Sequence, residues 1–265
     1  MTAAPLARAL GLAVALCLAG TAALAKEPKA ASPAIYEPTV GQAGKDVVWV
    51  PTSKSLADRM LDMAKVTKDD YVIDLGSGDG RTVIAAAKRG ARAHGIEYNP
   101  DLVELAKRNA EKEGVAGRAT FAKADIFESD FSKASVITLF LLPDLNLKLR
   151  PTLLKMKPGT RIVSNSFAMD DWEPDATANL EPGMCENSWC TALFWVVPAQ
   201  VAGRHKVAQG ELTLEQKFQK VTGTLKGADG KIVPVEGKLN GAEIELKAGT
   251  RTLRGKMNGT RLELA

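Results

Sequence analysis

The sequence has few of the residues that most often build metal sites and nucleophilic catalytic centres. Its 265 residues include two histidines and three cysteines. A structural zinc site needs four ligands of these kinds, and His94 and His205 lie far apart in the chain. We therefore expect no metal in this protein. The contents of 45% hydrophobic and 25% charged residues are ordinary for a globular protein, so a buried core is expected.

Two common phosphate-binding motifs are also missing. A dinucleotide fingerprint after the apolar run 71–75 would need a glycine where Arg81 stands, and no Walker lysine loop is present. Residues 74–80 instead have the pattern D-x-G-x-G-x-G and lead into residues 81–89, whose composition predicts a helix. A buried strand, a glycine turn and a helix N-terminus together let a ligand contact bare backbone.

Acidic residues follow the next two predicted strands. Residues 91–98 are expected to form a strand with Glu97 at its end, about twenty residues after the glycines, where a carboxylate can accept hydrogen bonds from both ribose hydroxyls. A third predicted strand, residues 119–124, runs directly into Asp125. The alternative is an NAD-type or purely structural nucleotide fold that carries these acids by chance.

This series of motifs resembles the class I S-adenosylmethionine-dependent methyltransferases. The resemblance implies that the glycine turn holds the methionine end of the cofactor, that Glu97 holds the ribose, and that Asp125 holds the adenine amine. The cofactor would be S-adenosyl-L-methionine. The residues that the resemblance places around it are Asp74, Gly76, Ser77, Gly78, Gly80, Glu97 and Asp125.

The segment before the first predicted helix narrows the resemblance. V-P-T-S at residues 50–53, the glycine turn, and E-x-N-P at residues 97–100 resemble the small methyltransferases related to the ATP synthase c-subunit lysine methyltransferase. The similarity covers residues 47–165. It implies a membrane-associated enzyme that methylates a lysine of a protein.

A fourth predicted strand, residues 134–142, ends in Leu-Leu-Pro-Asp. Ligands bind beyond the carboxyl ends of the strands in open α/β sheets, so this end is expected to face the transferring methyl group. Nucleic-acid amino-methyltransferases typically have an N-P-P-Y tetrad there, so nucleic acid is not an expected substrate. We expect the acceptor to contact Pro51, Thr52, Leu142 and Pro143.

A lysine amine must be neutral to attack the methyl group, which requires desolvation or a nearby proton acceptor. The polar candidates at the strand ends are Asp144, Asn146 and Asn165. Asp144 alternatively only caps the next helix. The acidic run at residues 170–175 either rims the pocket or forms a solvated loop.

The predicted domains differ in pattern. Residues 47–199 are expected to form a Rossmann-like α/β domain with helices on both faces of the sheet. From residue 200 to residue 265 the sequence alternates with period two, and the segment 237–246 recurs as 255–264 around Asn-Gly. This pattern predicts a small antiparallel β meander or barrel of five or six strands, with a structural or partner-binding role. Its 12 lysines and arginines against 7 acids favour solubility, or else an anionic partner.

The first 25 residues have the pattern of a secretory signal, with Arg8, an apolar stretch and a small-x-small site at residues 23–25. An uncleaved membrane anchor is the alternative, although the stretch is slightly short for a span. Residues 26–46 have the composition of an extended linker. We therefore expect an exported or periplasmic protein, in which Cys185 and Cys190 would form a disulfide.

Three functions fit these observations. The first is a protein-lysine methyltransferase, and the second is a small-molecule or lipid methyltransferase with the same cofactor. The third is an exported binding module that no longer turns over. Methyl transfer needs no covalent enzyme intermediate, because the sulfonium is already activated and the protein mainly aligns the reactants and excludes water.

Overall fold

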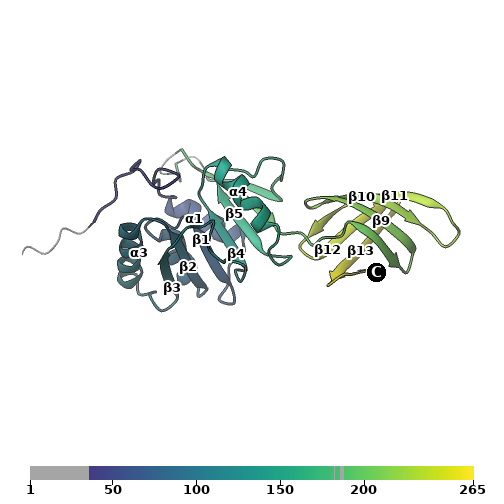
Figure 1. The fold of residues 1–265 in the computed structure, drawn as a ribbon, viewed down its shortest axis with the longest axis horizontal. Helices are drawn as coiled ribbons and strands as arrows, with labels where there is room; N and C mark the ends of the chain where they lie inside the picture. Colours follow the sequence, from purple (N-terminus) through teal and green to yellow (C-terminus); the bar gives the residue numbers. More distant parts are fainter. Residues whose placement is uncertain (1–35, 182, 186–187) are drawn as a thin grey trace, which may run out of the picture. The chain divides into compact units, whose positions relative to one another are not determined.

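The computed structural model describes residues 36–181, 183–185 and 188–265 (Figure 1). Residues Tyr36–Ala265 belong to one unit. The predicted signal, residues 1–25, and the first part of the predicted linker lie outside the described residues. Within the described ranges, no helix is both long and apolar enough to cross a membrane.

The first sheet has seven strands in the order β3-β2-β1-β4-β5-β7-β6. Its parallel strands are paired from β3 across to β5, and β7 and β6 continue the sheet in antiparallel pairing. The expected Rossmann-like α/β sheet is thus confirmed. The strands are β1 (Tyr71–Leu75), β2 (Arg92–Glu97), β3 (Ala119–Lys123), β4 (Val136–Leu139), β5 (Arg161–Asn165), β6 (Ala176–Asn179) and β7 (Thr191–Val196).

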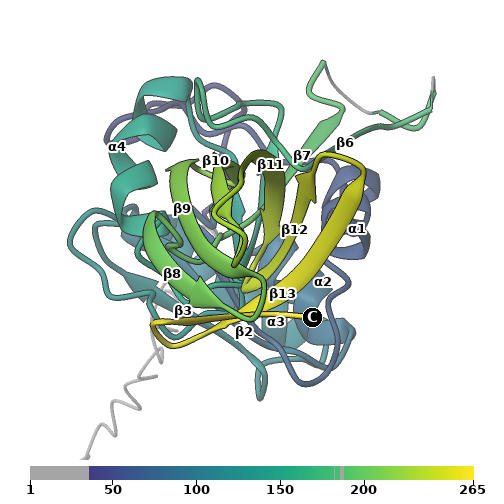
Figure 2. The ribbon, with the colours of Figure 1, turned by 90° about the vertical axis from the view of Figure 1, so that its right-hand side faces the viewer.

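Consecutive residues of the central strands supply the two cores. Val72, Val136 and Val163 face helices α1, α2 and α3, whereas the neighbouring Ile73, Ile137 and Ile162 face α4. Side chains of a strand alternate between its faces, so a strand covered on both faces is apolar throughout. Figure 2 shows α1 and α4 on opposite sides of the sheet. The helices are α1 (Lys54–Met63), α2 (Arg81–Lys88), α3 (Pro100–Lys112) and α4 (Pro143–Leu153).

The helices that flank the glycine turn begin as the sequence predicts. The Ser53 hydroxyl accepts a hydrogen bond from the backbone N–H of Leu56 at 3.2 Å, which caps α1. The Asn99 side chain caps α3 in the same way, and Pro100 occupies its first position. These caps fix the two chain segments that enter and leave the carboxyl ends of the strands.

The second sheet is an antiparallel meander of seven strands in chain order, with β8 and β14 at its edges. Its inner apolar face forms a separate core, and β8 and β14 lie close together, so the sheet is nearly closed (Figure 2). The strands are β8 (Gly203–Val207), β9 (Gly210–Lys217), β10 (Lys220–Lys226), β11 (Ile232–Asn240), β12 (Glu243–Ala248), β13 (Arg251–Asn258) and β14 (Arg261–Leu264).

The hairpin predicted around Asn240-Gly241 is present, but its turn does not centre on that pair. Asn240 pairs with Glu243, so the two-residue loop is Gly241-Ala242 and the asparagine is still in the strand. Gly241 has φ of +61°, as the first position of a type II′ turn requires. The predicted five or six strands become seven because β8 and β9 are joined at residues 208–209, where Asn-Gly is absent from the sequence.

The acidic run at residues 170–175 forms ion pairs with the second sheet. Such pairing was part of neither expectation for this run, a rim of the pocket or a solvated loop. Asp171 pairs with Lys217, Glu173 with Lys220 and Asp175 with Lys238, at 3.1, 2.7 and 2.8 Å. Between them, the buried Trp172 stacks on Phe218 of the β9–β10 turn with ring centroids 5.8 Å apart. Lysines of the second sheet therefore neutralise this loop.

Candidate active site

A groove lies at the carboxyl ends of β1, β2 and β4. The chain order reverses between β1 and β4, and this switch point is where open α/β sheets bind ligands. The larger part of the groove encloses about 730 Å³ including its open mouth. A smaller part continues past Trp49, Gly76 and Phe140 toward Asp74 and Thr52.

The glycine turn brings bare backbone to the groove. Gly76 and Gly78 have φ of +83° and +53°, a region that β-carbons disfavour. A Cβ on Gly78 would lie 2.7 Å from the indole Nε1 of Trp49. The backbone N–H groups of Gly76 and Ser77 donate to the carbonyl of Ile96 at 2.9 and 3.0 Å. The turn is thus fixed against the end of β2.

Ser77 and Gly80 shape the turn from beneath. The Ser77 hydroxyl is buried, has no hydrogen-bond partner among the described residues, and packs where a Cβ of Gly95 would lie. Gly80 caps α2 with φ of +84°, and a Cβ there would lie 2.7 Å from the ring of Phe121. Gly80 supports the turn by letting strand and helix approach closely, whereas Ser77 also lines the smaller part of the groove.

Glu97 connects the end of β2 to the glycine turn. Its carboxylate oxygens accept the backbone N–H groups of Gly78 and Asn99, each at 2.9 Å. Each oxygen keeps a further lone pair, so both can still accept ligand hydroxyls. The sequence predicted a ribose acceptor here. The brace on Gly78 is an additional role that the sequence analysis missed.

Asp74 is a buried carboxylate behind the glycine turn. The Thr138 hydroxyl donates to its Oδ1 at 2.6 Å, and the side chain borders the smaller part of the groove. The pKa of Asp74 is raised to about 7, mainly by burial and to a smaller extent by the nearby Glu97 and Asp79, while the Thr138 hydrogen bond opposes the rise. This carboxyl therefore titrates near neutral pH in the cofactor-free protein.

The raised pKa makes stability depend on pH. In the unfolded chain the carboxyl has its ordinary pKa of about 3.9, so between about pH 4 and pH 7 the folded protein binds more protons than the unfolded one. The contribution of Asp74 to the free energy of unfolding therefore falls as the pH rises through this window, and it is constant above it.

We expect Asp74→Asn to stabilise the cofactor-free protein at pH 8 by up to ~4 kcal/mol, because it removes the buried charge and keeps an oxygen for Thr138. The gain should shrink toward pH 4. Urea unfolding of both proteins at pH 4.5, 6 and 8 measures this difference. A gain of the same size at all three values would contradict the raised pKa.

A segment before α1, which we call the strap (residues 42–50), forms one wall of the groove. Lys45 pairs with Asp125, and its ammonium lies 4.9 Å from the centre of the Tyr98 ring. The hydrogen bond from Lys45 is the main cause that lowers the pKa of Asp125, and the Phe127 N–H adds to it. Asp125 keeps lone pairs for a ligand. Part of the predicted linker, residues 42–46, thus lies against the groove.

Trp49 fixes the other end of the strap. Its backbone pairs with Gln42 and Gly41 at 2.9 Å, and its indole lies against Gly78. The strap therefore reaches from the predicted adenine acceptor to the glycine turn. The sequence analysis placed no strap residue in the site, because the segment has neither helical nor strand periodicity.

Thr52 and Asn165 meet at the smaller part of the groove. The Asn165 amide is fully buried and donates to the Thr52 hydroxyl at 3.2 Å, while its oxygen accepts from the Ser166 hydroxyl at 2.8 Å. Pro51 and Thr52 both line this part of the groove. Two residues that are 113 positions apart in the chain are thus brought together.

The other predicted acceptor residues lie elsewhere. The chain leaves β4 at Leu139 and enters α4 at Pro143, so Phe140 and Leu141 face the groove while Leu142, Pro143 and Asp144 are exposed. Of the described residues that line either part of the groove, none belongs to 142–144. Leu142 is the N-cap of α4, without a side-chain cap among the described residues, so Asp144 is not the cap either.

Asn146 holds a loop rather than facing the groove. It is fully buried, and its amide donates to the carbonyls of Phe167 and Ala168 at 3.1 and 3.3 Å. Its Oδ1 has no hydrogen-bond partner in the described part of the chain. Asn146 thus positions the segment that follows β5.

Cys185 and Cys190 are joined by a disulfide, with Cα atoms 5.7 Å apart. The predicted pairing is confirmed. The export signal from which the disulfide was predicted, residues 1–25, lies outside the described residues.

Comparisons with known proteins agree with this geometry. A family model described as the ANTKMT methyltransferase domain matches residues 74–176. A protein-lysine N-methyltransferase of Saccharolobus islandicus is 43% identical over 163 residues, which cover 60% of this chain and 96% of that protein. The ATP synthase c-subunit lysine N-methyltransferase of Homo sapiens is 36% identical over 48% of this chain, which spans only 54% of that protein.

A solved structure shares both sequence and fold. It is titled as an RNA methyltransferase from Salinibacter ruber in complex with S-adenosyl-L-homocysteine, and it is 47% identical with a TM-score of 0.53. The match covers 57% of this chain and 96% of that one. Together with the fold and the groove, these similarities show that the chain belongs to the ANTKMT-type family of S-adenosylmethionine-dependent methyltransferases.

Proposed function

We propose that this enzyme transfers the methyl group of S-adenosylmethionine to a lysine amine of a protein. The observation that carries the proposal is the 43% identity to a protein-lysine N-methyltransferase, because the similarity spans 96% of that relative. The groove supports it, since the segment V-P-T-S of residues 50–53 lies beside the glycine turn and contacts the end of β5.

The groove fits the cofactor. At the glycine turn, a side chain on Gly78 would fill the space next to Trp49. Glu97 offers two carboxylate oxygens for the ribose hydroxyls, and Asp125 offers its oxygens to the adenine amine. When bound, the cofactor supplies an activated methyl group. The chain itself has to hold it, exclude water and orient the amine.

The acceptor amine would approach from the smaller part of the groove. Leu139 and Phe140 form an apolar wall there, which disfavours the ammonium form and helps keep the amine neutral. The Thr52 hydroxyl accepts one hydrogen bond from Asn165 and keeps a lone pair, with which it can accept an N–H of the amine. Asn165 then acts through Thr52 as a positioning residue, and Asp144 on the exposed turn of α4 has no part in this arrangement.

Labelling of cell extract with methyl-tritiated cofactor tests the acceptor class. The label should be released by protease, resist ribonuclease and organic extraction, and co-migrate with methylated lysine after hydrolysis. Gly78→Val enzyme serves as the inactive control. Label in RNA would instead indicate an RNA substrate, as the name of the Salinibacter ruber protein states for that enzyme. Label in a lipid or small molecule would indicate the second alternative. Either result contradicts the lysine proposal.

The compartment is a second proposal, supported by the signal pattern of residues 1–25 and by the Cys185–Cys190 disulfide. We expect the natively expressed protein to begin at Lys26 and to keep both cysteines oxidised. Intact-mass measurement with and without reductant and thiol alkylation reads out both features. A full-length chain in which Cys185 and Cys190 are both alkylated would contradict export and favour an uncleaved anchor.

A further inference from the structure

Three aromatic side chains from separate segments meet beside the groove. Phe140 follows β4, Phe167 follows β5, and Trp189 precedes β7. The ring centroid of Phe140 lies 6.1 Å from that of Phe167 and 6.1 Å from that of Trp189. The centroids of Phe167 and Trp189 are 5.0 Å apart. Each side chain is half-buried, so part of each ring stays accessible. We call these three residues the aromatic wall.

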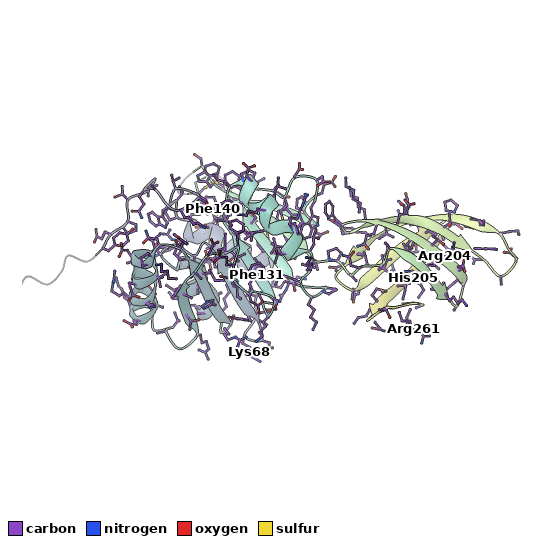
Figure 3. The ribbon with its side chains drawn as sticks, viewed as in Figure 1. Lys68, Phe131, Phe140, Arg204, His205 and Arg261 are labelled. Carbon is purple, nitrogen blue, oxygen red and sulfur yellow. A yellow bond between two sulfur atoms is a disulfide. The ribbon has the colours of Figure 1, made fainter. Side chains whose placement is uncertain are left out.

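Phe140 connects this wall to the active site. It lines both parts of the groove, together with Gly76 and Trp49 (Phe140 is labelled in Figure 3). The two acids at the cofactor end, Glu97 and Asp125, lie at the carboxyl ends of β2 and β3, on the other side of β1 from β4 and β5. The aromatic wall therefore lies on the acceptor side of the switch point.

The local structure around Phe167 is built to hold it in place. Its carbonyl accepts hydrogen bonds from the Ser164 hydroxyl at 2.7 Å and from the buried Asn146 amide at 3.1 Å. Ser166, the residue before it, has φ of +59°, a left-handed conformation that is unfavourable for a residue with a β-carbon. Such strain persists where the surrounding structure enforces it, and it is often found at functional sites.

Trp189 is held by a different device. It is adjacent to Cys190, which forms the disulfide with Cys185 and whose carbonyl accepts the Leu180 N–H at 2.9 Å. Cys190 is thus tied both to Cys185 and to Leu180, one residue from the indole.

We infer that the aromatic wall binds the side chain of the acceptor lysine, an inference that rests on the proposed function. Aromatic faces attract a cation through the ring quadrupole, and tryptophan does so most strongly. The methylene stem of the lysine would pack on Phe140 and Phe167, with the ammonium near Trp189, where it gives its proton to solvent water before the neutral amine enters the groove. Methylation leaves the nitrogen able to carry charge, so the wall also holds the mono- and dimethylated products for further transfers.

Variants of Trp189 test this role on the protein fraction that wild-type enzyme labels. Trp189→Ala should raise the KM for this fraction about five- to thirtyfold, whereas Trp189→Phe should stay within about twofold of wild type. Trp189→Leu keeps an apolar side chain without a π-face, and it should resemble the alanine variant. Calorimetry with S-adenosylhomocysteine should show unchanged cofactor affinity in all three, which excludes misfolding as the cause.

The matched control is Ile232→Ala, which removes an exposed apolar side chain from the second sheet and should leave KM unchanged. A wild-type KM in Trp189→Ala would overturn the aromatic wall while the lysine label still supports the proposed function. A wild-type KM in Trp189→Leu would overturn the cation-binding role. If no methyl-lysine forms with wild-type enzyme, the proposed function itself fails, and this inference falls with it.

Discussion

Gly78→Val should abolish measurable binding of S-adenosylhomocysteine. The φ of Gly78 is +53°, and a Cβ there would lie 2.7 Å from Nε1 of Trp49 and 3.2 Å from its Cδ1. A β-branched side chain at this φ is strained, and it would also occupy the narrow space between the glycine turn and the strap. We expect at least a hundredfold loss of affinity, or about 3 kcal/mol.

Gly114 provides a matched control for this prediction. It also has a positive φ, of +71°, but a Cβ there would have no atom of the described residues within 4 Å. Gly78→Ala and Gly114→Ala therefore carry similar backbone strain, and only the first crowds the groove. Calorimetric titration of both alanine variants separates the two effects. Equal affinities would mean that the close approach of Gly78 and Trp49 does not matter for the cofactor.

Glu97→Ala should weaken cofactor binding by at least tenfold, for two reasons that add. The variant loses the predicted acceptor for the ribose hydroxyls, and it leaves the N–H groups of Gly78 and Asn99 without their carboxylate. Hydrogen bonds to a charged group contribute about 1.5–3 kcal/mol, so the combined loss reaches a hundredfold if the turn also shifts.

Glu97→Gln tests whether the hydrogen bonds to Gly78 and Asn99 need both carboxylate oxygens of Glu97. The amide has one oxygen, so only one of the two backbone N–H groups finds an acceptor and the other faces an NH₂ donor. We expect Glu97→Gln to bind almost as poorly as Glu97→Ala. Glu104→Gln, on the exposed face of α3, serves as the control. Wild-type affinity in Glu97→Gln would show that the turn keeps its shape without the carboxylate.

The parts of the site that the sequence predicted are those that local chemistry fixes. Gly76 and Gly78 have positive φ, Glu97 is the last residue of β2, and Asp125 comes two residues after β3, at strand ends that meet at one edge. Such positions are set by the strand pattern and hardly depend on the rest of the fold.

The acceptor side was harder to predict, because it depends on one boundary. The apolar run after residue 134 has no internal signal for its end, and the strand was expected to continue to residue 142. In the structure β4 ends at Leu139 and α4 begins at Pro143, which brings Phe140 into the groove and leaves Asp144 exposed. Because β4 ends a few residues earlier than predicted, Phe140 faces the groove in place of Asp144.

Contacts between distant segments could not be predicted from the sequence, for a different reason. Lys45 meets Asp125 across 80 positions, and Asp171, Glu173 and Asp175 each meet a lysine of the second sheet. Charge patterns in the sequence show that such residues are available for pairing, but the topology decides which of them meet. The acidic run therefore resembled a solvated loop until both of its neighbours in space were known.

The two edges of the second sheet bear on how the enzyme behaves in concentrated solution. The edge strand β8 exposes Arg204 and Lys206, whereas on the neighbouring edge strand β14 the exposed Arg261 lies beside Glu263 (Arg204 and Arg261 are labelled in Figure 3). A sheet edge invites a strand from another molecule, but the two cations of β8 repel a second copy. This protection is electrostatic, so salt weakens it as the screening length falls from about 10 Å at 0.1 M to about 3 Å at 1 M. Self-association through the edge at β8 is therefore suppressed most strongly in dilute buffer.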